Sequence, residues 1–405
     1  MTTTATPIGT GRGEGRLRLG FMPLVDCAPL VVARDLGFAA AEGLELELVR
    51  ETSWANIRDR LMLGHFDAAH MLAPMPVAAR LGLGHVRAPV VAPFVLDQGG
   101  NSIAVTTALW REGGDWGGFG DPITSGRTLA RLVATRAKAG RDQLTFASVH
   151  PFSCHHHQLR HWMAAAGVDP DRDVRLTVVP PPHMVAVMEA GEVDGVCVGA
   201  PWTSRAVDAG IGHIVLPTAV LWPSTPEKVL GMREDLAARR SDEIDALLRA
   251  LDRAAAWTEA EANRDELAAI LARDDVVGVP AAIVARSLTG RLQVERGGAP
   301  VSVPGFLRFH GEGVNGPINR PRPTDGLWFA AQMLRAHQTG DADAAFAAAR
   351  EAFSSQRWDR VIGRPDRVDD TLRTFEGPLF DGGDPEKWLR AAGSGARADL
   401  GPAAS

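Results

Sequence analysis

Stretches with strand-type and helix-type patterns alternate along the first half of the chain, and this alternation restricts the folds that it can adopt. Residues 44–49 alternate apolar and charged side chains, which is the pattern of a half-buried strand. A helical pattern then starts after Ser53 and places Ile57 and Leu61 on one face. Strands and helices that alternate in this way form a parallel sheet covered by helices. The sequence therefore predicts an α/β fold.

The alternation occurs in two series, which we expect to form two units. A Gly-rich stretch at 111–126 separates them, and the second series covers 144–198. From Ser241 onward apolar residues recur at helical spacing, which predicts additional C-terminal helices. Residues 293–323 are expected to form a long loop. The predicted divisions are tails at 1–15 and 391–405, a first lobe with the helical extension at 16–106 and 214–390, and a second lobe at 107–213.

The composition is that of a globular protein and argues against several classes of function. The chain has 405 residues, 45% of them hydrophobic, and its net charge of −6 speaks against nucleic-acid binding through a basic surface. Its three cysteines are too scattered for a disulfide framework or a cysteine-rich metal site. The N-terminal sequence lacks the apolar core of an export signal, and no apolar run is long enough to cross a membrane. We therefore expect a cytoplasmic protein without membrane insertion, unless a misassigned start codon conceals an export signal.

The helix after residue 53 begins in a way that suits an anion. Ser53 is a favourable N-cap, and the first turn of a helix has unpaired N–H groups at the positive end of its dipole. Trp54 adds a flat aromatic wall in that turn. We therefore count Ser53 and Trp54 among the candidate ligand-binding residues.

A Cys-His-His-His run at 154–157 suggests a metal site at first sight. His157 and His161 share one helix face, but consecutive helical residues point about 100° apart, so the four cannot converge on one ion. We expect no metal and no cofactor here. Ser153 is the predicted cap of this helix, and His155 then lies in its first turn, facing a cleft.

No motif in the chain is a strong enzyme signature. Cys154 lacks a setting that would stabilise a thiolate. Asp67 and His70 form either a catalytic pair or, as we prefer, the floor of a cleft at a strand end. Lys228 is either a solvated surface charge or, near the return between the two units, the point charge that an anion needs. We therefore expect a binding protein, not an enzyme.

Several motifs resemble the nitrate/bicarbonate-binding proteins of ABC transporters, the CmpA/NrtA group. They include SWAN at 53–56, AAHMLAPMP at 68–76, FSCHHHQLRHW at 152–162 and PEKVLG at 226–231, and the similarity extends over roughly 17–340. The resemblance implies a two-lobed periplasmic-binding-protein fold of type II, here with extra C-terminal helices.

The resemblance also implies which residues surround the ligand. In the family's nitrate site a Trp, an amide, a His and a Lys hold the anion, and Trp54, His155 and Lys228 match these positions. The amide falls on Asn101, where a glutamine is expected, and Gln98 is the alternative occupant. Nitrate only accepts hydrogen bonds, whereas bicarbonate also donates one and would want a carboxylate nearby. Because the sequence shows no obvious carboxylate beside Lys228, nitrate or nitrite is the expected ligand.

The resemblance leaves more than one role open. Without an export signal the chain looks like NasS, the cytoplasmic nitrate/nitrite sensor, which implies an antiterminator partner of the NasT type that is released when the anion binds. The alternative is the substrate-binding component of an ABC transporter for nitrate, bicarbonate or another small anion, with a permease and ATPase as partners. A sulfonate or pyrimidine-precursor ligand, and an enzyme of the thiamin-pyrimidine class, are further alternatives.

Overall fold

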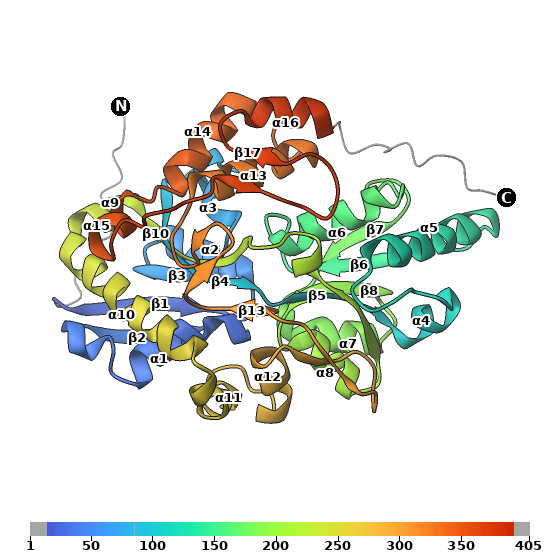
Figure 1. Ribbon diagram of the computed structural model, residues 1–405, viewed down its shortest axis with the longest axis horizontal. Coiled ribbons are helices and arrows are strands. Elements are labelled where there is room, and N and C mark those ends of the chain that lie inside the picture. The colour runs from blue at the N-terminus through green and yellow to red at the C-terminus, as the bar shows by residue number, and fades with distance from the viewer. Residues whose placement is uncertain (1–13, 85, 393–405) are drawn as a thin grey trace.

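Two β-sheets lie side by side in the computed structural model, which describes residues 14–84 and 86–392 (Figure 1). The first sheet has the strand order β13 (Leu307–Arg308), β4 (Val90–Gly99), β10 (Pro226–Arg233), β3 (Ala68–Leu72), β1 (Arg16–Phe21) and β2 (Glu45–Arg50). The second has the order β7 (Arg175–Val178), β6 (Thr145–Ser148), β8 (Gly195–Gly199), β5 (Asn101–Thr106) and β9 (Gly212–Pro217). The regions built on these sheets are called lobe 1 and lobe 2 below.

Each sheet combines parallel strands with antiparallel ones. β1 pairs in parallel with β2 and β3, and β6 pairs in parallel with β7 and β8, as the alternating pattern predicted. β10 instead runs antiparallel between β3 and β4, and β5 runs antiparallel between β8 and β9. β10 therefore brings a distant part of the chain into the middle of lobe 1.

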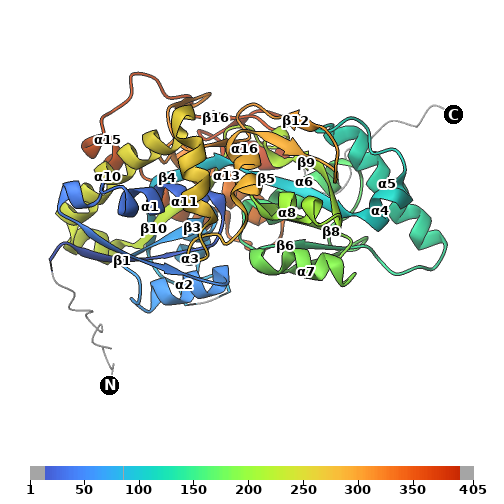
Figure 2. The ribbon, with the colours of Figure 1, turned by 90° about the horizontal axis from the view of Figure 1, so that it is seen from below.

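Helices cover both sheets. Figure 2 shows α1 (Ala28–Asp35) and α10 (Ser241–Glu259) on one side of β1 and α2 (Trp54–Met62) on the other. The other helix of the first βα series is α3 (Met75–Leu81). Lobe 2 carries α4 (Thr107–Gly113), α5 (Pro122–Lys138), α6 (Cys154–Ala165), α7 (Met184–Glu189) and α8 (Trp202–Asp208). The C-terminal helices are α9 (Glu234–Arg239), α11 (Arg264–Ala272), α12 (Ala281–Leu288), α13 (Pro323–Arg335), α14 (Ala342–Ala352), α15 (Gln356–Val361) and α16 (Pro385–Ala392). Within the described residues, no helix is long and apolar enough to cross a bilayer.

The sheets divide the chain at other residues than the sequence pattern suggested. β5 and β9 belong to lobe 2. The chain therefore passes from lobe 1 to lobe 2 near residue 100 instead of 106, and it returns to lobe 1 after residue 217 instead of 213. Gly99 and Gly100 both have a φ of 81°, which turns the chain between β4 and β5. The apolar strand β5, which follows these glycines, pairs with β8 and β9. The apolar pattern of a buried strand predicts that a strand forms but not which strands it pairs with.

Two segments expected to be loops contain regular structure. α5 begins at Pro122, earlier than expected, because Asp121 accepts hydrogen bonds from the N–H groups of Ile123 and Thr124. The 293–323 stretch contains several short strands, and one of them, β13, pairs with the end of β4. The remaining short strands are β11 (Arg291–Gln293), β12 (Pro300–Ser302), β14 (Glu312–Gly313), β15 (Gly316–Pro317), β16 (Thr371–Leu372) and β17 (Phe380–Asp381).

An aromatic cluster fixes the C-terminal segment to the rest of the protein. The ring of Trp328 on α13 is fully buried, and its centroid lies 5.2 Å from Phe380, 4.9 Å from Trp388 and 5.2 Å from Trp222. These edge-on contacts join three segments that are far apart in the sequence.

We expect Trp328→Ala to destabilise the protein by about 3–5 kcal/mol, because the substitution removes a buried ring and leaves a cavity. Guanidinium unfolding followed by circular dichroism measures the loss. Leu63→Ala is the control, since the Leu63 side chain is 67% exposed, and we expect it to change stability by less than about 0.5 kcal/mol. Equal losses in the two variants would contradict the role of the cluster.

Candidate functional site

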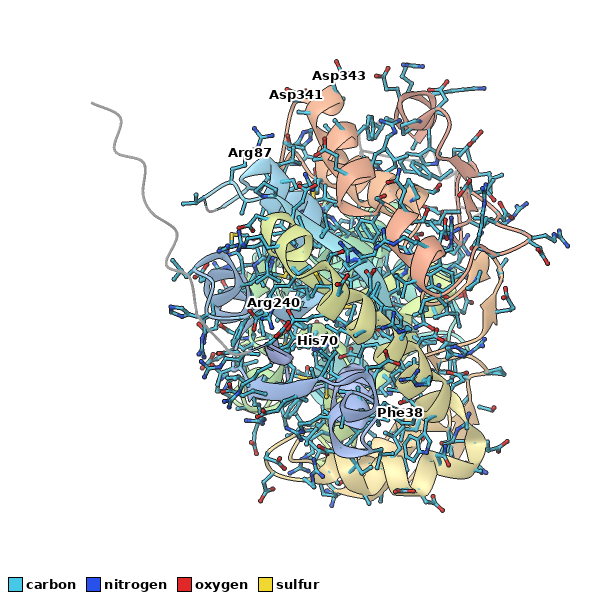
Figure 3. All side chains as sticks on the ribbon, turned by 90° about the vertical axis from the view of Figure 1, so that its left-hand side faces the viewer. Phe38, His70, Arg87, Arg240, Asp341 and Asp343 are labelled. Atoms are coloured by element: carbon cyan, nitrogen blue, oxygen red, sulfur yellow. The ribbon has the colours of Figure 1, made fainter. Side chains whose placement is uncertain are left out.

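A buried ion pair lies at the centre of lobe 1. Lys228, on β10, is 0% exposed, and its Nζ lies 2.8 Å from Oδ2 of Asp26, which follows β1 in a short 3-10 turn (Val25–Cys27). The other carboxylate oxygen, Oδ1, lies 3.0 Å from Nε2 of His70 on β3. Figure 3 labels His70 among the side chains of the structure. The Nδ1 of His70 accepts a hydrogen bond from the N–H of Met22. His70 is thus oriented by the backbone to donate to Asp26.

Lobe 2 reaches this ion pair through two amide side chains. The Nε2 of Gln158, on α6, donates a hydrogen bond of 2.9 Å to Oε1 of Glu227, the residue before Lys228. The Nδ2 of Asn101, at the start of β5, donates to Oε1 of Gln158 at 3.4 Å. All four side chains are buried. A continuous polar path therefore crosses from lobe 1 to lobe 2.

Trp54 and His155 stand in the first turns of α2 and α6, as the sequence predicted. Ser53 caps α2 by accepting from the N–H of Asn56, and Ser153 caps α6 by accepting from the N–H of His156. The Trp54 ring is buried and meets His70 edge-on, with ring centroids 5.3 Å apart. Trp54 Nε1 and both ring nitrogens of His155 have no hydrogen-bond partner among the described residues.

The charges of the central pair are firmly fixed. Burial raises the pKa of Asp26, but the charge of Lys228 and the His70 contact outweigh it and hold that pKa at about 2. Burial lowers the pKa of Lys228, but its carboxylate neighbours raise it above its usual value. Burial and the nearby charge of Lys228 keep the pKa of His155 well below its usual value. At neutral pH, Asp26 and Lys228 are therefore ionised and His155 is neutral, with one ring N–H to donate and one ring nitrogen to accept.

Two further carboxyl groups beside Lys228 are held in a different state. Burial raises the pKa of Asp97, on β4, well above its usual value, although Oδ1 accepts a hydrogen bond from the backbone N–H of Lys228. Burial also raises the pKa of Glu227 to about 7, against the charge of Lys228, whose Nζ lies 3.9 Å from Glu227 Oε2. Burial therefore favours the protonated form of Asp97, and Glu227 changes its charge near neutrality.

This arrangement is suited to a small polar ligand. A buried polar atom without a hydrogen-bond partner lowers the stability of the folded protein. Among the described residues, Trp54 Nε1, both ring nitrogens of His155 and Glu227 Oε2 have no hydrogen-bond partner. The ammonium group of Lys228 has three N–H donors, and Asp26 does not need all of them. A ligand with several oxygen acceptors would supply the missing partners. None of the described residues forms a cluster of three or more His, Cys, Asp or Glu side chains that could hold a metal ion.

The structure brings Trp54, Asn101, His155 and Lys228 toward one buried region, but it directs the other two candidates elsewhere. The Oγ of Ser53 is used as the helix cap. The side chain of Gln98 extends toward the strand pair near residue 313, since a Cβ added at Gly313 would lie 3.6 Å from Gln98 Oε1. The glutamine of the cluster is instead Gln158, which contacts Asn101 from α6.

Sequence reasoning missed most of the carboxylates. The expectation that no carboxylate lies beside Lys228 is wrong, because Asp26, Asp97 and Glu227 all approach it. Adjacent residues of a regular strand point to opposite faces, but β10 has register irregularities on both sides of Lys228 that change this alternation. No local sequence pattern reveals such an irregularity.

The less favoured alternative, a catalytic pair of Asp67 and His70, is not seen. Asp67 Oδ2 accepts a hydrogen bond from the N–H of Arg18 at 2.8 Å, and its Oδ1 lies 3.4 Å from Arg240. His70 faces Asp26 and lines the buried cluster, as the cleft-floor alternative suggested.

Comparison with known proteins places the chain among solute-binding proteins. The model of the NMT1-like family matches residues 11–272. The chain is 31% identical, over 96% of its length and 89% of the relative's, to the nitrate/nitrite binding protein NrtA of Synechococcus elongatus. It is 38% identical to the bicarbonate transport ATP-binding protein CmpC of the same species, over 80% of this chain and 46% of CmpC, so it spans about half of that protein.

The same comparison extends to solved structures. The periplasmic nitrate-binding protein NrtA of Synechocystis PCC 6803 superimposes with a TM-score of 0.83 at 26% identity, over 93% of this chain and 98% of that one. This match confirms the predicted two-lobed periplasmic-binding-protein fold of type II.

The raised pKa of Glu227 predicts how stability depends on pH. Its pKa rises from 4.5 to about 7 on folding, so the folded protein binds this proton more tightly and loses stability as the pH increases between those values. We expect the stability of the wild type, relative to Glu227→Gln, to fall by roughly 3 kcal/mol across this range and to stay constant above it. Denaturant unfolding of both proteins at a series of pH values measures the difference, and a difference independent of pH would show that Glu227 titrates normally.

Proposed function

Because the chain belongs to the NMT1-like family, and within it to the nitrate- and bicarbonate-binding NrtA/CmpA group, we propose that it is the substrate-binding component of an ABC importer for a small oxyanion. The ligand is nitrate or nitrite, or else bicarbonate. The relatives support this role, since NrtA is a nitrate/nitrite binding protein and CmpC belongs to bicarbonate transport. A permease and an ATPase are the partners that the role requires.

The observation that carries the proposal is the set of buried donors contributed by both lobes. Trp54 and Lys228 come from lobe 1, and His155 comes from lobe 2. The lobes are in contact around them, because Val25 N–H donates to Ala200 O at 2.9 Å and Trp202 Nε1 donates to Pro23 O at 3.1 Å. A ligand that bonds to both lobes stabilises this closed arrangement relative to an open one, which is how two-lobed receptors respond to their solutes.

Glu227 bears directly on which oxyanion is bound. A protonated Glu227 can donate a hydrogen bond and suits nitrate or nitrite, which only accept. An ionised Glu227 repels these anions but accepts the hydroxyl proton of bicarbonate. With its pKa at about 7, the residue can serve either ligand, depending on pH.

The relatives favour the transport role over the cytoplasmic sensor role, because those with printed functions are import, transport or binding components and the structural relative is periplasmic. Cytoplasmic localisation and an antiterminator partner of the NasT type remain predictions. Release of a co-purified antiterminator on addition of nitrate or nitrite would support them, and an unchanged complex at saturating anion would rule them out.

Removing single donors tests the site. Trp54→Phe keeps the ring but loses its N–H, and we expect about tenfold weaker anion binding, since a hydrogen bond to an ion contributes about 1.5 kcal/mol or more. Calorimetric titration with nitrate, nitrite and bicarbonate measures the change. Trp110→Phe is the matched control, because Trp110 lies on α4, where it stacks on His213. The absence of binding of all three anions by the wild type would overturn the proposed function, and equal affinities in both variants would overturn the site.

The ligand preference should depend on pH through Glu227. We expect nitrate affinity to fall several-fold from about pH 6 to about pH 8, because the ionised carboxylate repels the anion. Glu227→Gln should remove most of this dependence, as measured by the same titrations. Nitrate affinity that varies equally with pH in both proteins would show that another group controls it.

A further inference from the structure

A second pocket lies on the other side of α6 from the buried cluster. It has a volume of about 250 Å³ and opens between α6, the loop at 169–171 and α13. Its polar lining consists of His157, Arg160, His161, Gln332, Arg335 and His337, together with the carboxylates Asp169 and Asp171. Positions 157, 160, 161 and 164 share one helix face, whereas 155 and 158 point toward the cluster described above. The pocket therefore gives a separate role to the histidines that the anion site leaves unused.

Three buried nitrogen atoms of residues that line this pocket lack a hydrogen-bond partner among the described residues. His157 is 2% exposed and Gln332 is 4% exposed, and the Nε2 atom of each lacks a hydrogen-bond partner among the described residues. The Nε of Arg335 is buried without a partner in the same part of the chain. Unpaired buried donors of this kind indicate a place for a ligand that accepts hydrogen bonds.

Arg335 also lacks a close counter-ion. Among the described residues it makes no ion pair within 4 Å, although the charge of Glu376 attracts it from farther away. Its Nη1 donates to Gln332 Oε1 at 3.4 Å, and its guanidinium lies 5.4 Å from the centroid of the Trp388 ring. The other charges that face the pocket are already paired. Arg160 pairs with Asp171 at 2.6 Å, and Asp169 pairs with Arg172 at 2.6 Å. Glu376, which is not a lining residue, lies 3.3 Å from His161, which is one. Burial lowers the pKa of Arg335, which an added anion would reverse.

The pocket joins two parts of the fold. α6 belongs to lobe 2, whereas α13 packs on α14, and α14 packs on α3 and β4 of lobe 1 (Figure 1). The segment that carries Glu376 also reaches α6, where Phe375 contacts the His161 ring at 5.1 Å between centroids. A ligand held between α6 and α13 would therefore bond to both lobes.

We propose that this pocket binds a small carboxylate or phosphate-type oxyanion through Arg335, Gln332 and His157. Its size exceeds that of the ~150 Å³ cavity that admits benzene in an engineered protein, so a ligand larger than nitrate fits. The unpaired polar atoms beside it favour a ligand that forms hydrogen bonds. Because the ligand contacts both lobes, its binding favours closure and strengthens anion binding at the site beside Lys228. By linkage, an anion bound beside Lys228 strengthens binding in the pocket by the same factor. This coupling rests on the proposed function, whereas binding in the pocket does not.

Calorimetric titration of the full chain with succinate and with inorganic phosphate tests binding. We expect one of these probes to bind, with an affinity lowered at least tenfold by Arg335→Gln and by Gln332→Leu. Arg350→Gln, on the neighbouring α14, is the matched control and should have no effect, and Trp54→Phe should also leave probe binding unchanged. No binding of either probe, or binding that neither pocket variant weakens, would overturn the proposal.

Titration with nitrate and with bicarbonate, in the presence and absence of the saturating probe, tests the coupling. We expect the probe to increase the affinity for the anion several-fold in the wild type and not in Arg335→Gln. An unchanged affinity would overturn the coupling while leaving the pocket in place. Failure of both anions to bind without the probe would count against the proposed function. The titration with the probe alone would still show whether the pocket binds it.

Discussion

The structure of the site depends on the buried pair of Asp26 and Lys228. Two ions that leave water lose several kcal/mol of hydration each, and only close contact with additional hydrogen bonds compensates for this. Here Asp26 receives both the ammonium at 2.8 Å and the His70 ring at 3.0 Å, so the pair persists as ions. It joins β10 to the turn after β1 and to β3, three segments that the chain order separates widely.

This pairing has a consequence for anion recognition. Lys228 is the cation of the site, but Asp26 already balances its charge. A monoanion therefore meets a region with little net positive charge. Binding then depends on directed hydrogen bonds from Lys228, Trp54 and His155, together with the N-terminal dipoles of α2 and α6, which favour negative charge. Because recognition depends on oriented donors, the protonation state of Glu227 determines which anion is bound. One carboxyl oxygen of Glu227 changes from donor to acceptor when the proton leaves.

Local sequence signals predicted the elements well and their long-range contacts poorly. The caps Ser53 and Ser153 and the parallel βα order were predictable because they depend on neighbouring residues. The resemblance to the CmpA/NrtA group supplied Trp54, Asn101, His155 and Lys228. Neither approach supplied Asp26, Asp97 or Glu227, whose approach to Lys228 depends on strand order and on the irregular register of β10. The glutamine that contacts Asn101 and Glu227 comes from α6, a long-range contact that no local pattern encodes.

The central claim is that a trigonal oxyanion lies between the lobes beside Lys228, and a crystal structure of the protein grown with nitrate or with bicarbonate tests it most directly. We expect density for the anion within hydrogen-bond distance of Lys228 Nζ, Trp54 Nε1 and a ring nitrogen of His155, with both lobes in contact with it. An anion bound outside this cluster, or a cluster whose donors are satisfied by water alone at saturating anion, would contradict the account.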